Sequence, residues 1–265
     1  MADGLALKCN SLPPSKLGTL AYWDESYERE IVNFVDMGDE GEVWFGEDTS
    51  DEILDWMARY LPPPLTPTQA SFPSLSLQAE ANQPPPQIIW KNYHILDVGC
   101  GNGQLLFLLA QGGYPLESLA GIDYSASSIK LASQIAHSKG LDGLRLQQKD
   151  ILTDQIQRPA HATDNNKLGW DLIMDKGTFD AISLSESTID GRRLFEHYPR
   201  KVMDLLVKPG GIFLVTSCNW TEEELIQQFV ASGIGFKFHS KIPRPSFTFG
   251  GSQGSTVTTI AFEVA

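Results

Sequence analysis

The sequence predicts an α/β protein built on a doubly wound, mostly parallel sheet of seven strands, with additional helices N-terminal to the sheet. Three observations predict this fold. Short apolar runs alternate with helical patterns at the spacing of βαβ units, and the run Ile95–Val98 ends in a glycine-rich turn before an apolar helix. Two strand-like segments with no helix between them then close the chain. A length of 265 residues is enough for one such domain.

Two amphipathic helices are expected before the sheet. Apolar residues recur three or four positions apart in Leu20–Val35 and again in Asp48–Leu61, where Thr49 or Ser50 could provide the N-cap. The polar, proline-containing residues 1–18 are expected to form a flexible lead. The predicted divisions are the lead 1–18, an acidic helical segment 19–61, a Pro-rich insertion 62–86 and a core 87–265.

The insertion is marked by its composition. Eight of the sixteen prolines fall in residues 62–86, and Glu80 is its only charged residue. Such a segment disfavours both a helix and a central strand, so we expect an extended surface insertion.

Strands and helices are expected to alternate along the core, as in repeated βαβ units. The expected strands are Tyr93–Val98, Leu119–Asp123, Leu144–Gln148, Asp171–Asp175 and Gly211–Thr216. The expected helices are Gln104–Gln111, Ser127–Ser138, Arg192–Val207 and Glu222–Ala231. An antiparallel hairpin of Gly235–His239 and Thr256–Val264 is expected to complete the sheet.

Charge and composition exclude several functions. The net charge of −13 disfavours nucleic-acid binding, which uses clustered Lys and Arg. The longest apolar stretches, such as Gly211–Val215, are far shorter than the roughly 18 residues of a membrane span, and no secretory signal is evident. The three cysteines and five histidines are scattered, which argues against a disulfide framework and a metal site.

The negative charge is concentrated near the N-terminus. Tyr22–Asp55 holds thirteen of the 33 acidic residues and one of the 20 basic residues, and so contributes −12 of the net −13. Two interpretations stay open. The segment is either a solvated face that keeps the protein soluble or a docking surface for a basic protein partner.

The strongest motif follows the first core strand. The segment ILDVGCGNG places Asp97 before the alternating glycines Gly99, Gly101 and Gly103. Glycines at the carboxyl end of a parallel strand let the backbone approach a ligand closely. A dinucleotide fingerprint would need a glycine at position 104, where Gln104 stands. The carboxylate before the turn favours a cationic ligand with an amino acid end over a pyrophosphate.

Two further acids follow at the ends of the next strands. Asp123 lies 24 residues after Gly99, with Tyr124 beside it, and its carboxylate can accept from both hydroxyls of a ribose. Asp150 ends the third strand, where it can accept from an adenine amino group while Ile151 packs on the ring. An acid at a strand end is also a common turn residue, but these intervals together favour a ligand site.

These motifs resemble those of the class I S-adenosylmethionine-dependent methyltransferases, which have a Rossmann-like fold. From Leu17 onward, the segments YWDESYE, EVWFGE, DKGTFDAI and SFTFGGSQGSTV resemble more narrowly the eukaryotic protein-lysine methyltransferases of translation elongation factor 1-alpha, in particular the fungal elongation factor methyltransferase 4 group. The chain departs from that pattern in the Pro-rich insertion and in the polar loop Arg158–Gly169.

The resemblance implies an activity and additional site residues. It implies S-adenosylmethionine as cofactor and a lysine of the basic elongation factor as acceptor. We also expect a monomer in the cytoplasm, with the nucleus as an additional location. The resemblance also implies that Trp23, Tyr27 and Trp44 close over the cofactor and that Lys176 lies near it. The alternatives are core packing for the aromatics and an exposed side chain for the lysine.

The chemistry requires a proton acceptor. Free lysine is only about 0.1% neutral near pH 7.4, so the site must help to remove a proton before methyl transfer. Asp175, at the end of the fourth strand, is the candidate catalytic residue, although a carboxylate also stabilises the ammonium form. The Asn-Pro-Pro-Tyr pattern of many methyltransferases is absent here, so that motif does not assign the acceptor.

Two other functions stay open. A small-molecule methyltransferase would use the same cofactor site but would not need an acidic segment. A non-catalytic adaptor on a methyltransferase fold is the second alternative, and the intact acids and glycines argue against it. An NAD-dependent oxidoreductase is disfavoured by the glycine spacing.

Overall fold

The computed structural model describes residues 12–64, 93–161, 164–230, 233–244, 247–249, 252–254 and 256–265. Residues 1–11 of the expected lead, and the Pro-rich insertion from residue 65 onward, lie outside the described residues. Residues 12–18 belong to the expected flexible lead, but the structure holds them in place. They include the 3-10 helix η1 (Lys16–Gly18), and the Ser15 N–H donates to Leu184 O at 3.0 Å.

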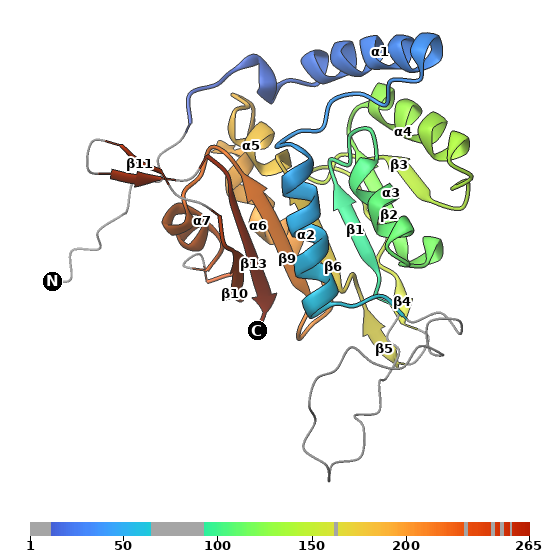
Figure 1. The fold of residues 1–265 in the computed structure, drawn as a ribbon. Coiled ribbons are helices and arrows are strands. Elements are labelled where there is room, and N and C mark those ends of the chain that lie inside the picture. The colour runs from blue at the N-terminus through green and yellow to red at the C-terminus, as the bar shows by residue number, and fades with distance from the viewer. Residues whose placement is uncertain are drawn as a thin grey trace, which may run out of the picture.

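The predicted sheet is confirmed, with seven strands in the order β10-β13-β9-β6-β1-β2-β3 (Figure 1). Five strands are mutually parallel, namely β1 (Ile95–Val98), β2 (Leu119–Asp123), β3 (Arg145–Gln148), β6 (Leu172–Lys176) and β9 (Ile212–Ser217). The antiparallel strands are β13 (Thr258–Val264) and β10 (Phe236–Ile242). The carboxyl ends of the five parallel strands therefore meet at one edge.

The expected helices are present with small shifts at their ends. They are α1 (Leu20–Met37), α2 (Glu47–Tyr60), α3 (Gln104–Gln111), α4 (Ala126–Ser138), α6 (Leu194–Leu205) and α7 (Glu222–Phe229). The expected cap of α2 is wrong. Thr49 and Ser50 are buried inside its first turn, where the Thr49 hydroxyl donates to Phe45 O, and the N-cap is Gly46 without a side-chain bond.

Several short elements were not expected from the sequence. They are helix α5 (Thr178–Ser183), the 3-10 helix η3 (Leu116–Ser118), and the hairpins β4–β5 (Ala160–His161, Asp164–Leu168), β7–β8 (Thr188–Ile189, Arg192–Arg193) and β11–β12 (Phe247–Phe249, Ser252–Gly254). The helix expected from Arg192 begins two residues later because Arg192 and Arg193 pair with the β7 strand. The hairpin β11–β12 lies in the connection between β10 and β13, for which the sequence analysis predicts no element.

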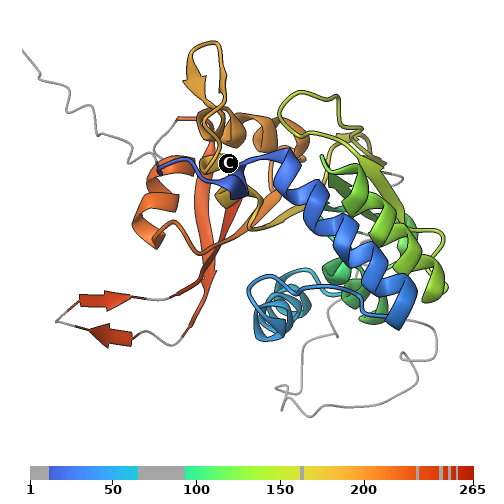
Figure 2. The same ribbon diagram turned by 90° about the horizontal axis from the view of Figure 1, so that it is seen from above.

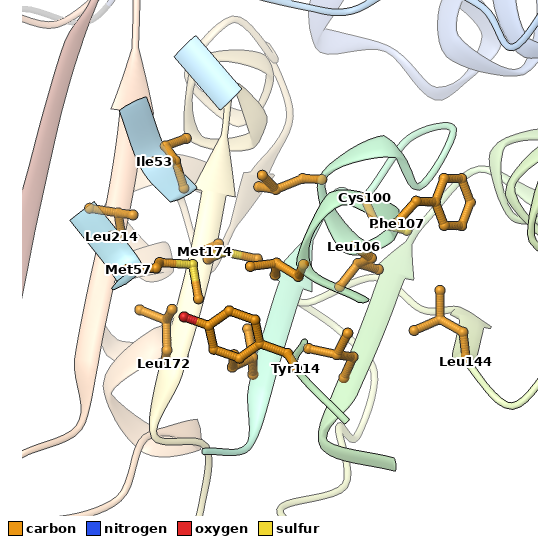
Figure 3. Close-up of a cluster of buried hydrophobic side chains, with 14 of the residues drawn as sticks. Ile53, Met57, Cys100, Leu106, Phe107, Tyr114, Leu144, Leu172, Met174 and Leu214 are labelled. Carbon is orange, nitrogen blue, oxygen red and sulfur yellow. The ribbon is translucent and has the colours of Figure 1, made fainter. Parts of the chain in front are cut away.

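Helices cover both faces of the sheet, and α2 is part of one of these layers. Its side chains Ile53 and Met57 are buried on the sheet beside Met174 and Leu214 (Figure 3). The Tyr114 hydroxyl, which is buried in the same layer, donates to the carbonyl of Leu61 just after α2. Helices α5, α6 and α7 cover the opposite face. The acidic segment is thus packed into the core and is not an independent unit.

Helix α1 crosses above the carboxyl edge of the sheet and packs along α4 (Figure 2). The hydroxyl of Thr19 accepts from the Tyr22 N–H at its start, and Gly38, in the left-handed region, ends it. Within the described residues, no helix has both the length and the apolar character of a membrane span.

Candidate functional site

A cavity of about 750 Å³ opens at the carboxyl edge of the parallel strands. Its wall includes residues from the ends of β1, β2 and β6, from helix α1, and from the connection between α1 and α2. All eleven residues predicted to bind the cofactor line it, namely Trp23, Tyr27, Trp44, Asp97, Gly99, Gly101, Asp123, Tyr124, Asp150, Ile151 and Lys176. The structure thus brings together residues separated by as much as 153 positions in the sequence, although their roles stay predictions.

The glycine-rich turn after β1 is held against β2. The N–H groups of Gly99 and Cys100 donate to Ile122 O at 2.7 and 3.0 Å. Gly99 has a φ of 66°, and a Cβ there would overlap the hydroxyl of Thr178. Gly101 has a φ of 55°, and a Cβ there would lie 2.8 Å from the Tyr27 hydroxyl oxygen. Both positions therefore need glycine for conformation and for space.

The carboxylate of Asp123 is fixed in orientation by backbone donors. The Gly101 N–H donates to Oδ2 at 3.0 Å and the Ser125 N–H to Oδ1 at 2.9 Å. The side chain of Asp150 caps a turn, accepting from the Leu152 N–H at 2.8 Å. Each carboxylate still has lone pairs available to a ligand.

Asp97 differs from these two acids. Its side chain is 3% exposed, and none of the described residues donates a hydrogen bond to it. Burial raises the pKa of Asp97 to about 7, the nearby Lys176 ammonium opposes that rise, and the carboxylates of Asp175 and Asp123 add to it. Such an acid favours a cationic ligand because the ligand would supply the missing donor and the missing charge.

Aromatic rings from α1 and from the connection between α1 and α2 meet over the cavity. Trp23 lies edge-to-face against Trp44 at 5.2 Å between ring centroids and stacks on Tyr27 at 6.2 Å. The Trp23 indole N–H donates to Leu17 O at 2.8 Å, which fixes its orientation. These rings both line the cavity and pack on one another, so contact with a cofactor and packing of the aromatic side chains are compatible.

Lys176 ties this aromatic connection to the end of β6. Its Nζ donates to Trp44 O at 3.1 Å and lies 5.9 Å from the centroid of the Phe45 ring. Burial lowers the pKa of Lys176, while the carboxylates of Asp97 and Asp175 oppose that shift. The Lys176 side chain is therefore partly buried and links Trp44 to the end of β6. It is not the exposed side chain that the sequence left open as the alternative.

The structure does not bring Asp175 to the cavity wall. Its side chain is 1% exposed and accepts hydrogen bonds from the Tyr198 hydroxyl at 2.6 Å and from the N–H groups of Thr178 and Phe179. Burial raises the pKa of Asp175 to about 7, and these hydrogen bonds oppose the rise. The carboxylate anchors the start of α5 and is not part of the cavity wall.

Asp180 lies on the cavity wall and was missed by the sequence reasoning. It stands on α5, and its carboxylate accepts from the Ser217 hydroxyl at 2.5 Å and from the Cys218 N–H at 2.9 Å. Burial raises the pKa of Asp180. A signal was present, because the segment DKGTFDAI contains two acids, but only its first was weighed. Within the described residues, no group of three His, Cys, Asp or Glu side chains could hold a metal ion.

Comparisons with known proteins identify the family of the chain. A family model described as a methyltransferase domain matches residues 89–239. Protein-lysine N-methyltransferase efm4 of Schizosaccharomyces pombe is 43% identical over 260 residues, covering 96% of this chain and 97% of that protein. EEF1A lysine methyltransferase 2 of Homo sapiens is 36% identical, covering 94% and 87%. EFM4 of Saccharomyces cerevisiae is 35% identical, covering 95% and 96%.

Solved structures share the fold at low sequence identity. Magnesium protoporphyrin IX methyltransferase of Synechocystis, solved with bound SAM, has a TM-score of 0.51 at 13% identity, covering 91% of this chain and 97% of that one. The cyclase SpnF has a TM-score of 0.54 at 16% identity, covering 88% and 78%. These likenesses show the fold alone, whereas the relatives above match nearly the whole chain. The chain belongs to the family of protein-lysine N-methyltransferases that includes efm4 and EEF1A lysine methyltransferase 2.

Proposed function

We propose that this protein transfers a methyl group from S-adenosylmethionine to a lysine side chain of translation elongation factor 1-alpha. Its relatives, protein-lysine N-methyltransferase efm4 and EEF1A lysine methyltransferase 2, support both the lysine acceptor and the elongation factor. The single observation that carries the proposal is the meeting, in one cavity, of Asp97, Asp123 and Asp150 with a set of aromatic rings.

The residues of the cavity fit this cofactor. Asp97 would accept from an ammonium group, since it has no donor of its own among the described residues. Asp123 would accept from two vicinal hydroxyls, and Asp150 with Ile151 offers an acceptor and an apolar surface to an adenine. Trp23 and Trp44 would face the positive charge, an attraction of roughly 0.5–2 kcal/mol. When bound, S-adenosylmethionine supplies a methyl group activated by a sulfonium.

The acceptor amine must be neutral to attack, so a group in the cavity has to take its proton. Asp180 is suited to this role because it lines the cavity and burial raises its pKa. The Ser217 and Cys218 donors hold its carboxylate in one orientation. Asp175 would have a structural role, because it holds the start of the helix that carries Asp180.

The acidic segment supports a basic protein substrate. Six of its carboxylates have partners within the protein. Asp24 accepts from the Ser125 hydroxyl, Glu30 from the Glu42 N–H and Asp39 from the Gly41 N–H. The other three, Glu25, Glu40 and Glu52, form ion pairs with Arg29, Lys139 and Arg244. Seven exposed acids have no such partner among the described residues, namely Glu28, Asp36, Glu42, Glu47, Asp48, Asp51 and Asp55. These seven leave negative charge available to attract a basic surface.

The test is methylation of a named substrate. Purified protein is incubated with radiolabelled S-adenosylmethionine and recombinant elongation factor 1-alpha, and the labelled lysine is mapped by mass spectrometry. We expect Asp123→Ala to abolish labelling, and Asp142→Ala, an exposed acid outside the cavity, to leave it intact. Label confined to small molecules would instead identify a small-molecule methyltransferase. No cofactor binding by calorimetry would identify an adaptor.

Location and assembly belong to the same proposal. A substrate that serves translation favours the cytoplasm, with the nucleus as an additional location, and we propose that the enzyme acts as a monomer. Fluorescence imaging of the tagged protein and analytical ultracentrifugation test these two statements.

A further inference from the structure

The cofactor motifs account for only part of the cavity wall. Those motifs stand at the ends of β1, β2 and β3, on one half of the carboxyl edge. The wall continues past the end of β6 along α5 to the end of β9, where Cys218 and Asn219 line it. The cofactor motifs do not extend to this second half, where Asp180 stands.

The cover over this second half is residues 12–19, here called the strap. The Ser15 N–H donates to Leu184 O, and Gly18 lies directly on the backbone of Leu184 and Ser185, where a Cβ would overlap both residues. Residues 14–19 of the strap line the cavity. The strap is therefore held on the segment that follows α5 and forms a wall of the cavity.

Arg193 fastens the strap to that segment. Its guanidinium donates to Leu12 O at 3.3 Å, to Ser183 O at 3.0 Å and to Ser185 O at 3.1 Å. One half-buried side chain thus joins the start of the strap to the carboxyl end of α5. Its planar fork can satisfy several carbonyls at once, which a lysine cannot do with the same geometry.

The chemistry of this half of the cavity matches a lysine side chain. Its wall includes the apolar side chains of Pro14, Leu17, Ile182, Leu184 and Leu194. The carboxylate of Asp180 stands at the sheet edge between the ends of β6 and β9. A lysine consists of an apolar four-carbon stem that suits such walls and an amine that suits a carboxylate.

We propose that the strap and the segment after α5 form the channel for the acceptor lysine, and that Arg193 is the positioning residue that holds this channel in shape. The inference rests on the proposed function and adds to it the place where the substrate enters. The strap also touches the cofactor side, since Leu17 O accepts from Trp23. Its other anchors, Leu184, Ser185 and Arg193, all lie on the α5 side, which favours a substrate wall over a cofactor lid.

Two independent pairs of variants test the channel. Gly18→Ala pushes the strap off the backbone of Leu184, and Gly143→Ala is its control, because a Cβ at Gly143 meets only an ordinary contact of 3.6 Å with Leu116. Arg193→Gln removes the fastening, and Arg192→Gln alters the exposed neighbouring arginine. For each protein, calorimetry measures the Kd of S-adenosylhomocysteine, and assays measure kcat and KM for elongation factor 1-alpha.

We expect Gly18→Ala and Arg193→Gln to raise the substrate KM about tenfold while the Kd of S-adenosylhomocysteine changes less than twofold. Both controls should match the wild type. A parallel loss of S-adenosylhomocysteine affinity, or an unchanged substrate KM, would overturn the channel. A third variant, Ile182→Phe, fills the channel from α5 and leaves Gly18 and Arg193 unchanged, and it should lose methylation while still binding S-adenosylhomocysteine.

The two proposals fail in different ways. If the wild type methylates the elongation factor and the channel variants do so equally well, the channel is refuted and the function stands. If the wild type binds S-adenosylhomocysteine but methylates no lysine, the proposed function fails, and the channel that rests on it fails as well.

Discussion

At the residue scale, the protonation of Asp97 affects both the folding stability of the protein and its affinity for a ligand. Asp97 is buried near two other carboxylates, and its pKa is raised to about 7. Because the folded protein favours the protonated form, folding stability falls as the pH rises from about 4 toward 7. A cationic ligand reverses this preference by stabilising the carboxylate.

This predicts pH-dependent cofactor binding. Between pH 5.5 and 7.0 the ionised fraction of an acid with a pKa near 7 rises on the order of tenfold, while the cofactor amine stays charged. We expect the affinity for S-adenosylmethionine, measured by calorimetry, to rise by the same order. Asp97→Asn should weaken binding, flatten the profile and raise the Tm at pH 7. A flat profile in the wild type would contradict the role of Asp97.

Two neighbouring acids make opposite predictions at the same scale. Asp180→Asn should lower kcat by about 100-fold or more, because it removes the group placed to take the proton of the amine. Asp175→Asn should keep kcat close to the wild-type value, since Asn imitates the protonated acid and still accepts from Tyr198 or the start of α5. Rapid-quench kinetics at saturating substrate, with the Tm as a folding control, separates the two. The reverse order of effects would restore Asp175 as the catalytic residue.

At the element scale, α2 joins the acidic segment to the core. Met57 is fully buried beside Met174 and Leu214 (Figure 3). Met37, at the end of α1, is 74% exposed. We expect Met57→Ala to lower the free energy of unfolding by about 2–5 kcal/mol in urea titrations, because it leaves a cavity. Met37→Ala should change it by less than about 0.5 kcal/mol. Equal effects would mean that α2 does not stabilise the sheet.

The bounds of the helices and strands show which elements could be predicted from local sequence patterns. The strand Leu119–Asp123 and the helix Gln104–Gln111 were predicted with the bounds that they have, since an apolar run and a helical period are local patterns. Helix α5 was missed because its six residues are too few to establish a period. The cap of α2 was assigned to Thr49 or Ser50, but the tertiary structure buries both residues inside the helix.

At the scale of the whole molecule, charge predicts how the substrate arrives. The acidic segment carries nearly all the net charge, and helix α1 crosses the edge where the cavity opens (Figure 2). We expect kcat/KM for the elongation factor to fall about tenfold or more as ionic strength rises from about 0.05 to 0.5 M, because salt screens the attraction. Neutralising Glu28, Asp36, Asp51 and Asp55 together should weaken that dependence and leave S-adenosylhomocysteine binding unchanged. A rate that does not depend on salt would leave the segment only a solubility role.

The sequence by itself determined the α/β sheet, the succession of its strands and helices along the chain, and the acids and glycines at the strand ends. These features follow from periodicity and spacing, which a linear chain displays directly. Only the tertiary structure decided which of two acids five residues apart reaches the cavity, and that residues 14–18 of the expected lead form one of its walls. The reason is that a side chain's access to a ligand depends on what packs around it. Asp175 is enclosed by Tyr198, which lies 23 positions further along the chain, and by the start of α5, a helix that the sequence did not predict.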